Sequence, residues 1–502
     1  MLPGSPSFRR NSPRAAILKS ALVFVVSSVV AGLSGGSTPA RADASCPPPA
    51  QVDGIVTAAL AAGNVPGASV AIFCGGRMWY VKGYGLRDVA SRAPVDENTI
   101  FRFGSVTKEF VAVAMLQLAS EGKLAITDPV ARWYPGITSA GTITVADLLG
   151  QVSGYRDYYP LDYVDVEMSQ PITVEEIVRR YGSFPLTAPP RTRWEYSNTN
   201  FAIAGRIVER TTGSSLQAYM KRSIFDPSKM MRTAFDEPPR ADPDRSVGYN
   251  SFFGEPPHDE PFEAPAWLNG AAALAGTASD LVRFDVALMH HAILDESSFG
   301  RMMTEGVAGG TPTGDGLGVS VDMLNGHRIA GHGGNVIGFA SYDLMAPDDD
   351  VAVAVLTNSY EAPAGAIASR LLRTMLTAPP AVATVAPTLV GAVAAPSPTP
   401  VPPAGEDEFR GWIAHLQAGR PDYAQMTPDF RRFMDAAMVP RARDALEPLG
   451  VPQSVAIGGR SERGGFVVTG GAIRFATRSV YAVMFQAPDG RVAEFLLFPI
   501  LQ

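Results

Sequence analysis

Ser105 and Lys108 are the residues whose types and spacing most directly suggest catalysis. They open a stretch from Val106 to Ala119 that is almost entirely apolar, which predicts a helix buried on nearly all sides. The three-residue spacing places both side chains on one face of that helix. Burial lowers the pKa of a lysine, and a neutral amine can take a proton from a neighbouring hydroxyl, so Ser105 is a candidate nucleophile. The backbone N–H groups of the helix N-terminus could stabilise a developing oxyanion.

A second serine–lysine pair with the same spacing, Ser120 and Lys123, closes the same stretch. Gly122 is a typical C-terminal cap, so we interpret this pair as the end of the helix. Because a serine–lysine pair alone is a weak signal, the site at Ser105 needs partners elsewhere in the chain.

Tyr196 and Asn198 are the first candidate partners. A phenol near a lysine ammonium has a lowered pKa, so Tyr196 is expected to act as a general base and then as a general acid. The amide of Asn198 is suited to hold either a substrate carbonyl or Lys108.

His332, Gly333 and Gly334 are the second group of candidates and precede a strand expected from Ile337. The two glycines would let a substrate lie against the backbone. Taken singly, these residues are equally compatible with a packed aromatic, a loop histidine and a turn. Only the complete set, in this order, favours a catalytic site.

Three motifs carry a resemblance to a known superfamily: Gly104–Lys108, Tyr196–Asn198 and His332–Gly334. In this order they resemble the motifs of the serine β-lactamase and DD-peptidase superfamily. The most similar branch is the β-lactamase-related group, which includes class C β-lactamases, a D-alanyl-D-alanine carboxypeptidase, D-aminopeptidases and family VIII esterases. The resemblance covers roughly Gln51 to Met375. It implies an antiparallel sheet flanked by helices, an all-helical subdomain, and an active site between them.

The resemblance also implies a role for each residue. Ser105 would be the nucleophile that forms an acyl-enzyme, and Lys108 and Tyr196 would activate it and relay protons. The substrate-binding residues would be Asn198, His332, Gly333, Gly334 and Asn335. The backbone N–H groups of Ser105 and Asn335 would form the oxyanion hole.

The chain departs from the superfamily pattern at the strand motif. No lysine follows Lys229, so the lysine–threonine–glycine motif of true class C β-lactamases is absent and His332 stands in its place. A neutral imidazole binds a substrate carboxylate less reliably than an ammonium. This argues against efficient β-lactam hydrolysis and favours a peptidase, an amidase or an esterase. Pro190–Arg191 also stands where relatives often carry proline–glycine, so the loop before Tyr196 is expected to differ.

Composition excludes several other classes. The chain has 502 residues with 46% hydrophobic content, enough for a large core in two or three domains. A net charge of −7 does not fit a nucleic-acid binder. The two cysteines and six histidines show no metal-ligand spacing, and there is no Walker loop, so we expect neither a metal nor a cofactor.

Residues 1–42 are typical of a secretory signal peptide, with a basic region, an apolar stretch and the cleavage motif Ala40–Ala42. The apolar stretch is short for a bilayer span, although an uncleaved anchor is the alternative. We therefore expect a periplasmic or secreted protein with no stable membrane span. In such a compartment Cys46 and Cys74 could form a disulfide or remain free thiols.

The expected fold class is α/β (α+β), in three segments after the signal peptide: a hydrolase domain (43–377), a linker with eight prolines (378–405) and a small α+β domain (406–502). Helices are expected at Val52–Ala62 and Ala364–Leu376, and capping boxes start others at Thr144, Thr173 and Thr277. Strands are expected at Ala68–Phe73, Met78–Tyr84, Gly318–Leu324, Ile337–Met345 and Val351–Thr357. The C-terminal domain is expected to place the helices Asp407–Leu416 and Pro428–Leu446 on a meander of short strands, with no cluster that suggests catalysis.

The favoured function is an exported serine hydrolase that acts through an acyl-enzyme on a D-amino-acid peptide or amide, or on a small ester. The alternative is a non-catalytic protein on the same scaffold that binds penicillin or recognises peptidoglycan. A true class C β-lactamase is less well supported than either. The expected partner is a small-molecule or peptide substrate, for example one derived from peptidoglycan. The oligomeric state is left open.

Overall fold

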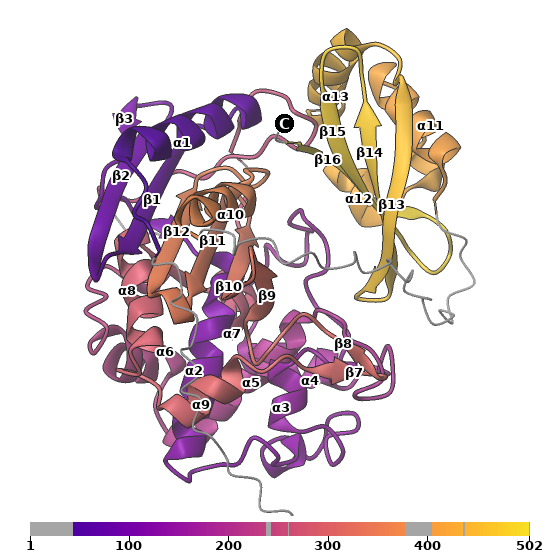
Figure 1. The fold of residues 1–502 in the computed structure, drawn as a ribbon. Coiled ribbons are helices and arrows are strands. Elements are labelled where there is room, and N and C mark those ends of the chain that lie inside the picture. Colours follow the sequence, from indigo (N-terminus) through magenta and orange to yellow (C-terminus); the bar gives the residue numbers. More distant parts are fainter. Residues whose placement is uncertain (1–43, 237–241, 260, 377–403, 435–436, 501–502) are drawn as a thin grey trace, which may run out of the picture. The chain divides into compact units, whose positions relative to one another are not determined.

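A seven-stranded antiparallel sheet, with the strand order β3-β2-β1-β12-β11-β10-β9, is the largest sheet of the computed structural model (Figure 1). The structure describes residues 44–236, 242–259, 261–376, 404–434 and 437–500. The strands are β1 (Gly67–Cys74), β2 (Arg77–Asp88), β3 (Ala93–Pro94), β9 (Ser320–Leu324), β10 (His327–Val336), β11 (Phe339–Ala346) and β12 (Val351–Thr357). The predicted signal peptide and almost all of the predicted linker lie outside the described residues.

The central strands β1 and β12 are buried along their whole length because both faces of the sheet are covered. Alternate residues therefore belong to two different cores. Val353 packs in a core with α1 (Pro49–Gly63) and α10 (Ala364–Met375). Its neighbour Ala354 packs in the larger core with α8 (Ala278–Met289) and the helical region.

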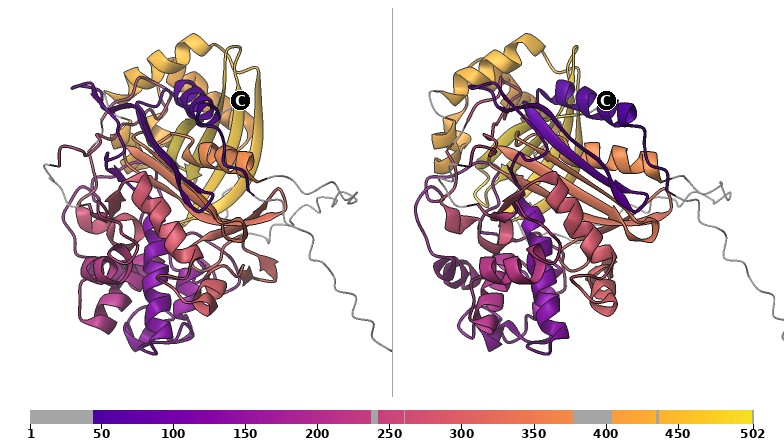
Figure 2. Two further views of the ribbon diagram at one scale, coloured as in Figure 1. Left: turned by 60° about the vertical axis from the view of Figure 1, so that its left-hand side comes forward. Right: turned by 90° about the vertical axis from the view of Figure 1, so that its left-hand side faces the viewer.

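Helix α2 (Thr107–Ser120) lies at the centre of the helical region, where Figure 2 shows it in violet. All of its residues from Thr107 to Leu116 are buried, as the apolar stretch predicts. The other main helices of this region are α3 (Val145–Leu149), α4 (Val174–Gly182), α5 (Asn198–Thr212), α6 (Leu216–Met220), α7 (Asn269–Ala272) and α9 (Glu296–Met302). The side chains of Thr144, Thr173 and Thr277 cap α3, α4 and α8, as predicted.

Residues 404–500 form the C-terminal segment, which belongs to the same compact unit as the seven-stranded sheet. Its antiparallel sheet has the order β13-β14-β15-β16. The strands are β13 (Ser454–Arg463), β14 (Phe466–Arg474), β15 (Ser479–Gln486) and β16 (Val492–Pro499), and the helices are α11 (Glu406–Gln417), α12 (Pro428–Phe433) and α13 (Met438–Leu446).

The predicted fold class is confirmed, but three element predictions were wrong. The single helix predicted over Pro428–Leu446 is two helices, α12 and α13. Two of the short strands expected in the C-terminal meander, Phe466–Thr469 and Ile473–Ala476, are one strand, β14, because Gly470 and Gly471 between them also pair within the sheet. The strand β10 was not predicted at all.

The sulfur atoms of Cys46 and Cys74 are bonded at 2.00 Å, which ties the segment before α1 to the end of β1.

Gly122 ends α2 in the left-handed region with φ +71°, and its N–H donates to the carbonyl of Ala119. Among the described residues, no helix is both long and apolar enough to cross a membrane.

Candidate active site

Ser105 lies on a single 3-10 turn, Gly104–Val106, that leads directly into α2. Its Oγ is 3.0 Å from Nζ of Lys108 and accepts a hydrogen bond of 2.7 Å from the hydroxyl of Tyr196. The side chain of Ser105 is partly exposed, whereas Lys108 is completely buried. The predicted serine, lysine and tyrosine are therefore in direct contact; Ser105 and Tyr196 are partly exposed, and the serine is open to solvent in the way a nucleophile requires.

Lys108 is held by two further acceptors. Its Nζ lies 2.8 Å from Oδ1 of Asn198 and 2.9 Å from the carbonyl of Ala271 on α7. Burial lowers the pKa of Lys108 well below its usual value; the carboxylate of Asp157 raises it and the guanidinium of Arg463 lowers it further. The amine is thus suited to accept a proton from Ser105.

The pKa of Tyr196 is shifted in the opposite direction to the one expected from the sequence. We expected a nearby lysine ammonium to lower it, but burial raises the pKa of this phenol, against the lowering effects of Ser105 and Arg463. The expectation failed because burial disfavours the charge on Lys108 and on the phenolate alike. Tyr196 therefore rests as a neutral phenol that donates to Ser105.

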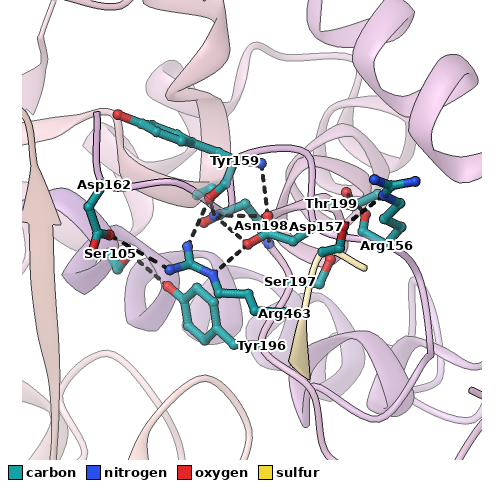
Figure 3. Close-up of polar contacts among 12 residues, drawn as sticks. Ser105, Arg156, Asp157, Tyr159, Asp162, Tyr196, Ser197, Asn198, Thr199 and Arg463 are labelled. Atoms are coloured by element: carbon teal, nitrogen blue, oxygen red, sulfur yellow. Dashed lines mark hydrogen bonds and ion pairs between the residues drawn. The ribbon is translucent and has the colours of Figure 1, made fainter. Parts of the chain in front are cut away.

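Asn198 is the first residue of α5, and its amide bridges two buried groups (Figure 3). The oxygen lies against Lys108, and the nitrogen donates to Asp157 at 3.0 Å and to the carbonyl of Tyr159 at 3.1 Å. Of the two roles considered for Asn198, this arrangement favours holding Lys108 over holding a substrate carbonyl.

The loop around Ser153 contacts the residues next to Tyr196 and Asn198. Its hydroxyl donates to Oδ1 of Asn200 at 2.6 Å, and Asn200 donates to Oε1 of Gln151. The same Gln151 oxygen accepts the backbone N–H of Ser197, at 3.1 Å. This loop therefore fixes the backbone that presents Tyr196.

The loop before Tyr196 does carry an unusual residue. Arg191 has φ +65°, a conformation that glycine adopts more readily, and its guanidinium is 2.5 Å from the carboxylate of Asp147. This ion pair stabilises a position where glycine would be expected.

His332 lies on β10, the strand that was not predicted, and not in a loop before the strand expected from Ile337, which is β11. Its Nδ1 is 2.5 Å from the carbonyl of Gly333. Burial, followed by the effect of Lys108, lowers the pKa of His332 to about 4. The imidazole is therefore neutral near pH 7, and the position of His332 on β10 offers no positive charge to a substrate carboxylate.

Gly334 also has a different role from the expected one. A Cβ at this position would lie 1.9 Å from the carbonyl oxygen of Phe103, so the glycine allows β10 to approach the segment before Ser105. A Cβ on Gly104, which has φ +53°, would likewise lie 3.0 Å from the backbone N of Asn335. These close approaches bring the backbones of Asn335 and Ser105 to one cleft, as the predicted oxyanion hole requires. Gly333, unlike Gly334, lines that cleft.

Gly334→Ala is expected to lower the free energy of unfolding by about 2–3 kcal/mol, because the added methyl group overlaps backbone that cannot move independently. Gly141→Ala is the matched control, since a Cβ there has no atom within 4 Å. It should change stability by less than about 0.5 kcal/mol. Urea unfolding followed by circular dichroism checks both, and equal midpoints for the two variants would contradict this interpretation.

Arg463 was missed by the sequence interpretation. It is the last residue of β13 in the C-terminal segment, yet its guanidinium lies 5.3 Å from the centre of the Tyr196 ring. Its Nε donates to Asp157 at 3.0 Å and its Nη2 to the carbonyl of Tyr159 at 2.8 Å. An arginine at a hairpin tip gives no sequence signal of the surface that it contacts.

Ser105 and Tyr196 line a cleft of about 490 Å³. Besides Ser105, Tyr196 and Asn198, its walls include His332, Asn335, Tyr159, Leu161, Asp162, Trp194, Tyr360, Arg463 and Phe498. The last two come from the C-terminal segment, so this segment forms part of the cleft wall.

Three carboxyl groups, those of Glu109, Asp285 and Asp343, cluster in the core beneath β10. All three side chains are buried, and burial raises the pKa of each of them. Asp343 also accepts the backbone N–H of His332 at 3.3 Å. Glu109 neighbours Lys108 in sequence, but its carboxyl group belongs to this cluster and not to the cleft.

Comparison with known proteins shows which sequences this chain is similar to. The chain is 27% identical over 320 residues to Protein flp of Staphylococcus aureus (strain N315), covering 61% of this chain and 62% of that protein. It is 29% identical over 322 residues to a D-aminopeptidase of Cereibacter sphaeroides, covering 62% of this chain and 60% of that protein. The chain thus spans about three fifths of the length of these curated relatives.

A solved structure gives the same fold. The D-stereospecific amidohydrolase from Streptomyces sp. superposes with a TM-score of 0.55 at 26% identity, covering 64% of this chain and 97% of that one. The family model described as Beta-lactamase matches residues 52–374, which include every predicted motif. The chain belongs to the Beta-lactamase family, within the superfamily that its three motifs resemble.

Proposed function

We propose that the chain is a serine hydrolase that acts through an acyl-enzyme on Ser105. The observation that carries the proposal is the placement of Ser105 Oγ between Lys108 Nζ at 3.0 Å and the Tyr196 hydroxyl at 2.7 Å, at the wall of a cleft. The buried neutral amine of Lys108 can act as the base and the neutral phenol of Tyr196 as the acid, and both contact the hydroxyl of Ser105.

In the proposed acylation, Ser105 Oγ attacks the substrate carbonyl carbon while Lys108 takes the hydroxyl proton. The oxyanion accepts hydrogen bonds from the backbone N–H groups of Ser105 and Asn335. Tyr196 gives its proton to the leaving amine or alkoxide, and the new lysine ammonium, whose Nζ is 4.8 Å from the phenol ring, stabilises the phenolate. Transfer of a proton from Lys108 to Tyr196 restores both groups, and water then releases the acyl group by the reverse proton transfers.

We propose D-amino-acid amides or peptides and small esters as the substrate class. The neutral His332 supports substrates that need no cation on β10, and thus argues against β-lactams, whose carboxylate needs one. The D-aminopeptidase and the D-stereospecific amidohydrolase among the similar proteins support the same class.

A substrate panel tests this proposal: D-alanine and L-alanine p-nitroanilides, p-nitrophenyl acetate and benzylpenicillin, each with the wild-type protein and Ser105→Ala. We expect serine-dependent turnover of the D-anilide or the acetate, and a lower kcat/KM for benzylpenicillin. Benzylpenicillin as the best substrate would contradict the proposed class. A stable penicillin adduct on Ser105 with no turnover of any compound would favour the non-catalytic penicillin-binding alternative.

We also propose that the protein is exported and begins at Asp43 after cleavage. The signal-like residues 1–42 and the bonded pair Cys46–Cys74 support this, because disulfides persist in oxidising compartments. Intact mass of the protein recovered from the producing cells should match a chain starting at Asp43, and retention of residues 1–42 would contradict cleavage.

A further inference from the structure

The turn between β13 and β14 enters the active-site cleft and is bound there on both sides of Arg463. Arg156 donates to the carbonyl of Gly464 at 2.8 Å, and Arg193 forms an ion pair of 2.7 Å with Glu462. Between these anchors, Arg463 reaches Asp157 and the carbonyl of Tyr159 (Figure 3). The two anchors hold the turn against the cleft, so they place the positive charge of Arg463 at the cleft wall.

Asp157 is the fully buried carboxylate beside Arg463, 3.0 Å from its Nε, whereas Asp162, 20% exposed, lies 3.9 Å from the same guanidinium. The side chain of Asp157 has no exposed surface, whereas that of Arg463 is 26% exposed. Its Oδ1 accepts the backbone N–H and the side-chain N–H of Asn198, both at 3.0 Å, which fixes the start of α5. Asp157 is therefore a buried carboxylate that the fold needs for its hydrogen bonds, and a buried charge requires a partner.

Asn198 connects this ion pair to Lys108. One end of its amide contacts Asp157 and the other contacts Lys108. The negative charge of Asp157 favours the ammonium form of Lys108, and the positive charge of Arg463 opposes it. Without Arg463, the carboxylate of Asp157 would lack this positive charge beside it. Only the amide of Asn198 would then separate that carboxylate from the amine of Lys108, which must be neutral to act as the base.

We infer that Arg463 is a positioning residue, supplied by the C-terminal segment, which neutralises Asp157 so that Lys108 can accept the proton of Ser105. The inference rests on the proposed function, because it assigns Lys108 the role of base. It gives the C-terminal segment a part in the chemistry beyond covering the cleft.

The remaining titratable groups that face Lys108 do not replace Arg463. Tyr196 is a neutral phenol, since burial raises its pKa. His332 is a neutral imidazole near pH 7, with its pKa lowered to about 4 by burial. Arg463 is thus the positive charge that the structure places beside Asp157 and Lys108.

The test measures the rate at which a fluorophosphonate labels Ser105 between pH 5 and pH 10, by intact mass of the full chain. Labelling needs neutral Lys108, so the rate should rise with pH through one inflection. Arg463→Gln should move that inflection up by about one pH unit or more. At pH values below the wild-type inflection, the labelling rate should therefore fall roughly tenfold. Asp157→Asn, which keeps an oxygen for Asn198, should move it down.

Two further variants separate charge from packing. Arg463→Lys keeps the positive charge and should retain an inflection close to that of the wild type. The double variant Asp157→Asn/Arg463→Gln removes both charges and should return the inflection toward the wild-type value, whereas a packing defect would not be reversed.

An unchanged inflection in Arg463→Gln, or a shift that the double variant does not reverse, would overturn the inference. If Arg463→Gln does not fold, an unchanged inflection in Asp157→Asn overturns it instead. Labelling that is absent in the wild type, or equal in Ser105→Ala, would contradict the proposed function itself and is thereby distinguished from a failure of the inference.

Discussion

Ser105→Ala is expected to lower kcat/KM by at least about 10⁴-fold on any substrate that the wild type hydrolyses, because no acyl-enzyme can form without Oγ. The Lys108 and Tyr196 side chains would remain but would have no nucleophile between them. Steady-state kinetics on the best substrate of the panel measures the loss.

Ser120→Ala is the matched control, since Ser120 belongs to the second serine–lysine pair of the same helix. Its Oγ donates to the carbonyl of Gln117 at an exposed position, so its removal should change kcat/KM less than about threefold. A Ser105→Ala protein with more than a tenth of the wild-type activity would show that another nucleophile carries the reaction.

Lys108→Met is expected to lower kcat/KM by about 10²- to 10⁴-fold, because methionine has a similar length but cannot accept the proton of Ser105. The acid limb of the pH profile should disappear with it: protonation of Lys108 abolishes the base in the wild type as the pH falls, and the variant has no such group. Kinetics from pH 5 to pH 10 checks both effects, with Lys123→Met from the second pair as the control.

A different result would reassign the base. If Lys108→Met kept more than a tenth of the activity while Tyr196→Phe abolished it, the phenol would be the base in spite of its raised pKa. A profile that is flat from pH 5 to pH 10 in the wild type would exclude a titrating lysine–tyrosine pair altogether.

Local patterns were sufficient to predict the main parts of the fold and the reacting residues. The spacing of Ser105 and Lys108, together with the apolar helix behind them, predicted a hydroxyl beside a buried amine, which the structure places at 3.0 Å. Threonine caps predicted where α3, α4 and α8 begin. These features depend on residues close in sequence, so they can be recognised without the tertiary structure.

The errors arose where tertiary packing decides the outcome. Strand β10 contains Gly331, Gly333 and Gly334, which disrupt the alternation of apolar and polar residues expected of a strand. Only a glycine fits at position 334, because a Cβ there would overlap the carbonyl oxygen of Phe103, a residue far away in sequence. The direction of the Tyr196 pKa shift depends on burial that the sequence does not state.

The position of Arg463 in the cleft was missed for the same reason. More than 300 residues separate it from Asp157, and only the folded chain brings the turn after β13 into the cleft. No local pattern at Arg463 distinguishes it from an exposed charge at a hairpin tip.

The most direct test of the central claim is trapping of the acyl-enzyme. Wild-type protein and Ser105→Ala are mixed with p-nitrophenyl acetate, quenched in acid within milliseconds to seconds, and compared by intact mass and peptide mapping. The account predicts one acetyl group on the wild type, located on Ser105, and none at that position in Ser105→Ala. Turnover of the ester by the wild type with no acyl group on Ser105 at any time, or with the group on another residue, would contradict it.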